Sequence, residues 1–251
     1  MAKVTIRDAF SRGAHMHRLA NFTFAAVLAL GLSTFWSNAL AVGDLELLCD
    51  FRTVANHLID GDLEKARFAT VECEKIALRN QSKTFGPETL RGYYLATAQI
   101  LTAQGNFDGA RERIAKAVEL PKTVLVPLDY LEETTQGYLL ERLGQLDDAV
   151  HFYRRLDNPG AQIRLAKIYL DRGQTSDALE TIRASIKASP NDPGAYAVLG
   201  QIFERSGSTN ALDQYKTAMA LAAQGNPSIV PLVYIEVHEA KVGIARLARK
   251  P

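Results

Sequence analysis

The sequence predicts an all-α protein, built as a solenoid of about five stacked helix hairpins with one further helix after them. Three observations support this prediction: a turn motif that recurs five times, apolar residues at helical spacing on both sides of the turns, and helix-start signals before two helices. The chain has 251 residues, and its 47% hydrophobic content is normal for a globular protein. Repetition at this spacing is typical of repeat architectures.

The recurring turn motif has a Gly that ends one helix, a short polar link, and an Ala near the start of the second helix. Gly stops the first helix because it accepts the left-handed conformation past the helix end. The link residues are expected to offer side-chain oxygens to the free N–H groups of the second helix. Ala is expected where two helices approach too closely for a larger side chain. The five copies are residues 61–66, 105–110, 144–149, 173–178 and 207–211.

Core-filling residues follow each motif Ala at helical spacing. The residue four positions later is predicted to fill the core, and the one three positions further on is again small or apolar. In the last three hairpins these residues are Tyr153, Ile182 and Tyr215, followed by Leu156, Ser185 and Ala218. Asn158-Pro159 and Asp192-Pro193 predict helix starts, with a capping residue before a Pro in the first turn. One such hairpin cannot bury its apolar face alone, but a stack can.

Residues 45–221 resemble the tetratricopeptide family, and residues 159–192 form one ungapped unit of the family's length. Residues 83–88, which lead into Tyr93-Tyr94-Leu95-Ala96, are similar to the longer units of kinesin light chains and many bacterial repeat proteins. The resemblance implies a right-handed α-solenoid. The turn glycines are separated by 44, 39, 29 and 34 residues, so the third unit is expected to have a clipped second helix. The units are expected at about 47–79, 87–120, 130–157, 159–190 and 193–221, within a repeat domain of residues 42–226.

Residues 227–251 are predicted to form one more helix. Its apolar stripe covers the last hairpin, because a terminal repeat needs its core face covered. Binding of this amphipathic stretch to a membrane surface or a partner is the alternative interpretation. The stripe consists of Val233, Val237, Ala240, Ile244 and Leu247, and the opposite, polar face of Glu236, Glu239, Arg246 and Arg249.

Residues 1–41 read as an export or anchoring segment. A basic stretch precedes the uncharged apolar run 22–32, and Ala39-Leu40-Ala41 supplies small residues at the two positions that a signal peptidase reads. The run is shorter than the roughly 20 residues that a spanning helix prefers. A cleaved signal peptide, which leads to a bacterial periplasm, is the first interpretation. An uncleaved membrane anchor over residues 21–41 and an organelle presequence are the alternatives, and all three predict membrane proximity.

The net charge of +1 comes from this leader, which holds +3 and leaves the body at −2. A near-neutral, mixed-charge body provides no field that would attract nucleic acid. The chain contains no Gly-rich phosphate loop and no Gly-x-Ser-x-Gly nucleophile elbow, so we expect neither an enzyme nor a cofactor. His57, His151 and His238 fall in different units, and we therefore expect no metal site.

The two cysteines, Cys49 and Cys73, are predicted to lie at the same end of the first hairpin. In an oxidising compartment they would form a disulfide, which could contribute on the order of 3 kcal/mol. Two buried free thiols are the alternative. Their spacing is unlike Cys-x-x-Cys, so redox catalysis is not expected.

The family resemblance implies that the first helices of successive hairpins line a concave groove that takes extended peptides or helices. In this groove an aromatic anchor combines with cations and amides, which suits an acidic or polar ligand. Solvated Arg and Lys side chains with no ligand are the alternative. The expected partner-binding residues are Leu95, Gln99, Thr134, Tyr138, Arg142, Arg164, Lys167, Gln201 and Arg205.

These expectations combine into an interaction scaffold or assembly factor of the cell envelope, which binds a partner segment in its groove. The partners would be other proteins. A structural protein that self-associates, as a homo-oligomer, and a membrane-anchored adaptor are the alternatives. Fold alone does not establish function, since repeat scaffolds serve many pathways.

Overall fold

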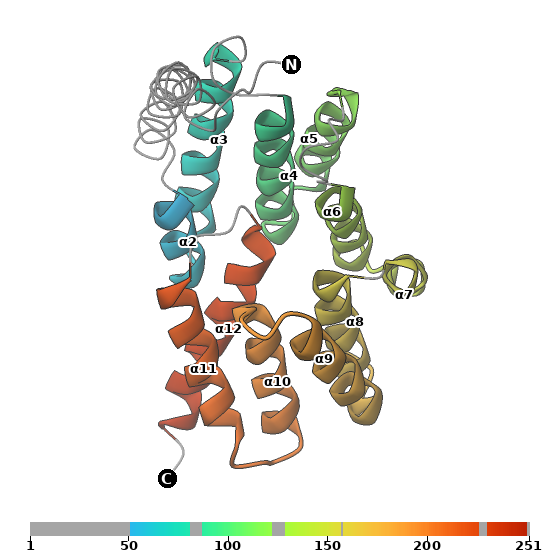
Figure 1. Cartoon of the computed structure of the whole chain (residues 1–251), viewed down its shortest axis with the longest axis vertical. Helices are drawn as coiled ribbons and strands as arrows, with labels where there is room; N and C mark the ends of the chain where they lie inside the picture. Colours follow the sequence, from blue (N-terminus) through green and yellow to red (C-terminus); the bar gives the residue numbers. More distant parts are fainter. Residues whose placement is uncertain (1–50, 81–86, 122–128, 157, 226–229, 250–251) are drawn as a thin grey trace, which may run out of the picture. The chain divides into compact units, whose positions relative to one another are not determined.

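The computed structural model describes residues 51–80, 87–121, 129–156, 158–225 and 230–249, whose helices belong to one compact unit (Figure 1). These residues form eleven helices and no strand, which confirms the predicted all-α class. Ten helices pair as consecutive hairpins, and the eleventh follows them. The hairpins are α2 (Phe51–Ile59) with α3 (Leu63–Asn80), α4 (Pro87–Ala103) with α5 (Phe107–Glu119), α6 (Asp129–Arg142) with α7 (Leu146–Arg155), α8 (Pro159–Asp171) with α9 (Thr175–Ala188), and α10 (Pro193–Arg205) with α11 (Ala211–Gln224); α12 is Pro231–Leu247.

The turn inside each hairpin has the predicted geometry. All five motif glycines adopt positive φ angles, between 71° and 81°. In the first turn the N–H of Gly61 donates to the carbonyl of Leu58, and the N–H of Asp62 donates to the carbonyl of His57 at 2.8 Å. These bonds satisfy carbonyls at the end of the first helix, which is the expected role of a left-handed C-terminal residue.

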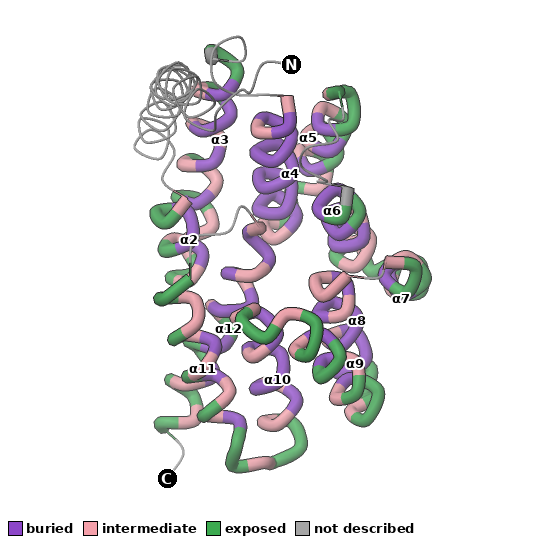
Figure 2. The backbone as a smooth tube through the Cα atoms, in the orientation of Figure 1, coloured by how far each residue is buried: buried purple, intermediate pink, exposed green. Residues whose placement is uncertain are grey.

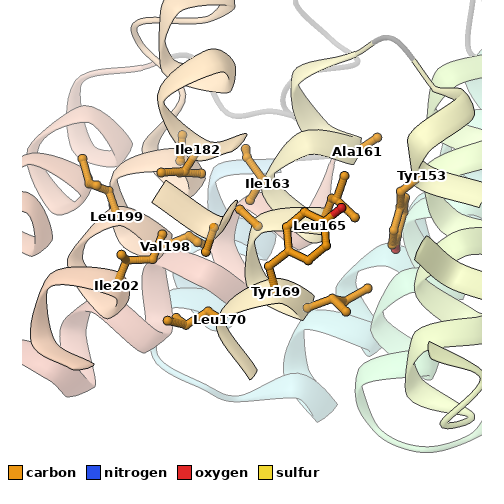
Figure 3. Close-up of a cluster of buried hydrophobic side chains, with 14 of the residues drawn as sticks. Tyr153, Ala161, Ile163, Leu165, Tyr169, Leu170, Ile182, Val198, Leu199 and Ile202 are labelled. Carbon is orange, nitrogen blue, oxygen red and sulfur yellow. The ribbon is translucent and has the colours of Figure 1, made fainter. Parts of the chain in front are cut away.

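The hairpins close around small residues, as the motif predicts. The five motif alanines are at most 2% exposed. A Cβ on Gly137 or Gly200 of the first helices would clash with the ring of Tyr153 or Tyr215, respectively. The two tyrosines come from the second helices and are themselves buried. The largest core cluster spans α7 to α10 and is drawn in Figure 3.

Helix capping follows the prediction at four starts and departs from it at three. Asn158 and Asp192 accept hydrogen bonds from the first turns of α8 and α10, and Asp62 and Asn106 do the same for α3 and α5. The prediction that all link residues act as caps is wrong for the remaining hairpins. Gln145 and Gln174 make no side-chain cap bond, because glutamine is longer than the short side chains that fit this geometry. Asn210 already has helical backbone angles.

The third hairpin has the clipped second helix that the glycine spacing predicts. Helix α7 has ten residues, whereas the second helices of the other hairpins have 13 to 18. Tyr153 still fills the core from this short helix. None of the described helices has both the length and the apolar character needed to cross a bilayer.

Helix α12 covers the last hairpin, as predicted, and also contacts the first two. It packs against α10 and α11, and additionally against α2 and α4. Glu236, assigned from the sequence to the polar face, is only 1% exposed, so that assignment is wrong. Figure 2 shows α4 and the N-terminal half of α12 as largely buried. Glu236 is buried because α12 lies among several helices and has no fully solvated face over its first two turns.

Candidate protein-interaction site

The nine predicted groove residues lie on α4, α6, α8 and α10, and we call the surface that they form the first-helix face. The structure does not leave this surface open along its length, because α12 lies against it. Leu95, Gln99, Thr134, Tyr138 and Arg164 are buried. Lys167 and Gln201 are half-buried, and Arg142 and Arg205 are exposed. The expectation of an open groove is therefore corrected at the five buried residues, of which Gln99 and Arg164 contact α12 of the same chain.

Gln99 connects the first-helix face to the start of α12. Its side-chain oxygen accepts a hydrogen bond from the backbone N–H of Leu232 at 3.2 Å, in a buried environment. Its side-chain nitrogen donates to the hydroxyl of Thr135 at 2.9 Å. The neighbouring helix α6 thus orients the amide so that the oxygen faces α12.

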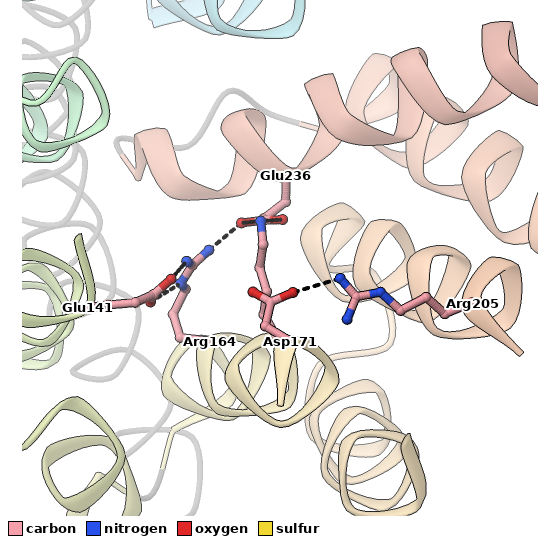
Figure 4. Close-up of polar contacts among 6 residues, drawn as sticks. Glu141, Arg164, Asp171, Arg205 and Glu236 are labelled. Carbon is pink, nitrogen blue, oxygen red and sulfur yellow. Dashed lines mark hydrogen bonds and ion pairs between the residues drawn. The ribbon is translucent and has the colours of Figure 1, made fainter. Parts of the chain in front are cut away.

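Four charged side chains form a cluster between α6, α8 and α12, in which Arg164 and Glu236 are buried and Glu141 and Lys167 are partly buried (Figure 4). Arg164 makes a bidentate pair with Glu141 and a further pair with Glu236. Lys167 donates to both carboxylate oxygens of Glu236, at 2.9 and 2.8 Å. Two cations and two carboxylates therefore balance, which a buried cluster requires if it is not to be strongly destabilising.

The pKa of Glu236 shows which effect dominates in this cluster. Burial by itself would raise it, but the charges of Lys167 and Arg164 and their hydrogen bonds outweigh burial and hold the pKa below its usual value. The carboxylate of Glu236 is therefore ionised at neutral pH. It supplies the negative charge with which Arg164 and Lys167 pair.

Tyr138, predicted as an aromatic anchor for a partner, instead packs under Arg164. The guanidinium lies 4.9 Å from the ring centroid, within the range of a cation–π contact. Burial raises the pKa of Tyr138 to about 12. The ring supports the charged cluster and is only 4% exposed, so it is not available to a partner in this structure.

The second half of α12 meets the end of α2. A ring nitrogen of His238 lies 2.9 Å from the carbonyl of Ile59, and Lys241 pairs with Asp60 at 2.7 Å. Helix α12 thus brings His238 to the first hairpin. No group of three potential metal ligands occurs among the described residues.

One part of the first-helix face remains accessible at α10. A cleft of about 410 Å³ is lined there by Gln201 and Arg205 of α10 and by Glu239 and Arg246 of α12. Arg205 pairs with Asp171 at 2.9 Å and is half exposed. The predicted residues Gln201 and Arg205 thus lie together at a solvent-facing cleft, one wall of which is α12.

The sequence analysis missed Glu236 and Glu141 as members of the site. A signal for Glu236 was present: residues 231–238 contain one carboxylate among otherwise apolar residues and a single His. A helical segment that is apolar on every side is buried, and an acid within it requires a cation. No comparable signal marks Glu141, which precedes an exposed Arg at the end of α6.

The predicted disulfide falls partly outside the described residues. Cys73 is 3% exposed and is disulfide-bonded, whereas Cys49 lies outside the described part of the chain. Its pairing with Cys73 stays a prediction. The leader over residues 1–41 also lies outside the described residues.

Comparisons with known proteins agree with the repeated hairpins. Residues 140–202 match the sequence model of the tetratricopeptide repeat. A stretch of 98 residues, 37% of this chain, is 30% identical to Protein CTR9 homolog of Arabidopsis thaliana, of which it covers 9%.

Two solved structures show a distant overall likeness. The first is a crystal structure of MamA, with 20% identity and a TM-score of 0.37, covering 67% of this chain and 94% of that one. The second is YrrB, described as a TPR protein with an unusual peptide-binding site, with 16% identity, a TM-score of 0.35, and coverage of 75% and 92%.

Proposed function

Because this chain is a tetratricopeptide repeat protein, we propose that it is an interaction scaffold of the cell envelope that holds a segment of another protein on its first-helix face. Proteins of this family bind other proteins or peptides and are typically non-enzymatic. The sequence contains no Gly-rich phosphate loop and no Gly-x-Ser-x-Gly nucleophile elbow that would favour a catalytic role.

The observation that carries this proposal is the way the first-helix face holds α12. Gln99 binds a backbone N–H of that helix, and Arg164 and Lys167 bind its Glu236. A surface that makes both backbone and carboxylate contacts has the chemistry of a site for a protein segment. The accessible parts of that surface include the exposed Arg142 and the cleft at Gln201 and Arg205.

The cell-envelope part of the proposal depends on the leader. The order of basic, apolar and small residues in residues 1–41 supports export to a bacterial periplasm, with retention by an uncleaved anchor as the alternative. N-terminal sequencing of the protein from its host tests this part. A mature protein that begins near residue 42 supports export, and an intact leader in the membrane fraction supports the anchor. An intact leader on a protein in the soluble cytoplasmic fraction would contradict both.

Affinity capture from the host envelope, followed by charge reversal, tests partner binding. Arg142→Glu and Arg205→Glu change two exposed cations of the first-helix face and should reduce capture of an acidic partner about tenfold. Arg183→Glu is the matched control, because Arg183 is exposed on the second helix α9. Circular dichroism should show an unchanged helix content in all three. Capture that is indifferent to both first-helix changes would contradict the assignment of the site.

Self-association is a second candidate function, favoured by one observation. Phe68 and Leu78 of α3 are 65% and 48% exposed, which is unusual for large apolar side chains. Light scattering over a range of concentrations tests it, with Phe68→Ser as the variant. A scattering mass that stays at the monomer value at every concentration would remove this candidate.

A further inference from the structure

We propose that the first-helix face is a receptor for an amphipathic helix of a partner protein, and that α12 is an internal occupant which the partner helix replaces. This inference rests on the proposed function and names the kind of partner. Because α12 is the helix that the face already holds, its contacts define what the replacing helix has to offer.

The first requirement is a helix start that lacks a cap of its own. The first residue of α12 is Pro231, which has no N–H, and the residue before it, Val230, makes no side-chain cap bond. The first N–H of the helix, on Leu232, donates instead to Gln99 of α4. The first four N–H groups of a helix have no partner within it, so the face itself supplies the missing cap.

The second requirement is a carboxylate one helical turn after the capped N–H. Without Glu236, the buried guanidinium of Arg164 would keep only the carboxylate of Glu141, and the half-buried Lys167 would lose both of its hydrogen bonds, so that two cations would face one carboxylate. An uncompensated buried charge is strongly destabilising. The face therefore disfavours an empty state and favours an occupant with an acid at this position.

The third requirement is apolar side chains around that acid. Leu232, Tyr234 and Val237 of α12 are all at most 5% exposed. Tyr234 belongs to a core cluster that it shares with Leu58 of the first hairpin and Ile100 of α4. The partner helix is thus predominantly apolar over its first two turns and carries a single glutamate there.

Replacement begins at the exposed end of α12. Its polar contacts there are that of His238 with the carbonyl of Ile59, the bidentate pair of the half-exposed Arg246 with Glu204, and the surface pair of Lys241 with Asp60. An exposed pair of this kind contributes little stability. Because α12 belongs to the same chain as the face, it is present there at a high effective concentration. An external helix binds only to the small fraction of chains in which α12 has left, and its apparent affinity is reduced in proportion to that fraction.

The experiment measures binding of a labelled peptide of residues 230–249 to the full chain by fluorescence anisotropy. In the full chain, Glu236→Gln weakens the internal helix, so this variant should bind the peptide at least about tenfold more tightly than the wild type. The same peptide with Glu236→Gln should bind that variant at least about tenfold more weakly. Glu180→Gln in the full chain is the control, because Glu180 is exposed on the second helix α9 and is not part of the first-helix face, and it should bind like the wild type.

Lys241→Glu is the second variant and decides the question if Glu236→Gln does not fold. It puts two like charges at the exposed end, beside Asp60, and should tighten peptide binding about two- to fivefold. Equal peptide affinity of the wild type and the loosened variants, or equal binding of the two peptides, overturns the inference. Dimers formed by Glu236→Gln would identify a second copy of this chain as the occupant and overturn it as well.

These outcomes separate the inference from the proposed function. If the peptide does not replace α12 but the Arg205→Glu variant still fails to capture envelope partners, the proposed replacement of α12 is wrong and the scaffold function stands. If the peptide replaces α12 and no partner is ever captured, the scaffold function fails, and the inference that depends on it fails too.

Discussion

Gln99 caps a helix that begins 133 residues later, through the hydrogen bond from the N–H of Leu232 to its side-chain oxygen. Because the same amide also donates to Thr135, one buried side chain joins α4, α6 and α12. The first-helix face and the start of the C-terminal helix are therefore linked by one buried amide.

Gln99→Leu should destabilise the protein by about 1–3 kcal/mol, because it leaves the buried N–H of Leu232 and the hydroxyl of Thr135 with one partner fewer. Urea denaturation followed by circular dichroism measures the change. Gln224→Ala, at the exposed end of α11, is the control and should stay within about 0.5 kcal/mol of the wild type. A similar small effect for Gln99→Leu would contradict the capping role.

Gly200→Ala should be destabilising by about 1–3 kcal/mol, because a Cβ at this position clashes with the ring of Tyr215. Gly160→Ala is the matched control. Its Cβ would have only an ordinary contact, 3.4 Å from the side-chain oxygen of Asn158, and alanine is the better helix former. Thermal unfolding of the two variants should therefore shift in opposite directions, and a shift in the same direction would count against the tight packing of α10 on α11.

The stability of the protein should depend on the ionisation of Glu236. Burial opposes ionisation, but Lys167 and Arg164 prevail and lower the pKa in the folded state. A carboxyl of this kind contributes stability above its unfolded pKa and loses the contribution as pH falls through its folded pKa. Glu236→Gln should therefore reduce the free energy of unfolding by about 3 kcal/mol or more at pH 7, and by progressively less in acid.

Urea titrations at pH 7 and at several acidic values check this dependence. The difference between the wild type and Glu236→Gln should narrow as the pH falls below the ordinary value of 4.5. Glu239→Gln, on the exposed face of α12, should follow the wild type at every pH. A difference that is constant over the whole range would show that the charge of Glu236 does not matter.

The mature protein should contain no free thiol. If Cys73 pairs with Cys49, non-reducing mass spectrometry gives a mass about 2 Da below that of the reduced chain. Cys73→Ser should then lower the stability by about 3 kcal/mol, since the bridge restricts the unfolded chain. Alkylation of two thiols without prior reduction would end the pairing hypothesis.

The hairpins were predictable because their signals are local. Gly61 and its counterparts mark the turns through a single backbone angle, and Asn158 and Asp192 mark helix starts through bonds that span two or three residues. The packing of a small residue against a large one, such as Gly200 against Tyr215, also takes place within one hairpin. A sequence read in windows of this length contains all of that information.

The position of α12 was not predictable in the same way. Its apolar stripe correctly indicates that it covers the last hairpin, but its additional packing on the first hairpin depends on contacts such as His238 with Ile59, 179 positions apart. The burial of Arg164 follows from the position of α12, so its treatment as a groove cation was wrong for the same reason. Only the isolated Glu236 in an apolar segment pointed to an enclosed helix.

The pairing of His238 and Lys241 with the end of α2 also has a consequence for biosynthesis. Ribosomes deliver α2 and α3 long before α12 exists, so the first hairpin emerges with part of its apolar surface uncovered. Contacts so distant along the chain close slowly, and nascent chains with exposed apolar surface are prone to aggregate. Until translation has passed Lys241, the newly made amino-terminal half therefore depends on dilution or on chaperones to stay in solution.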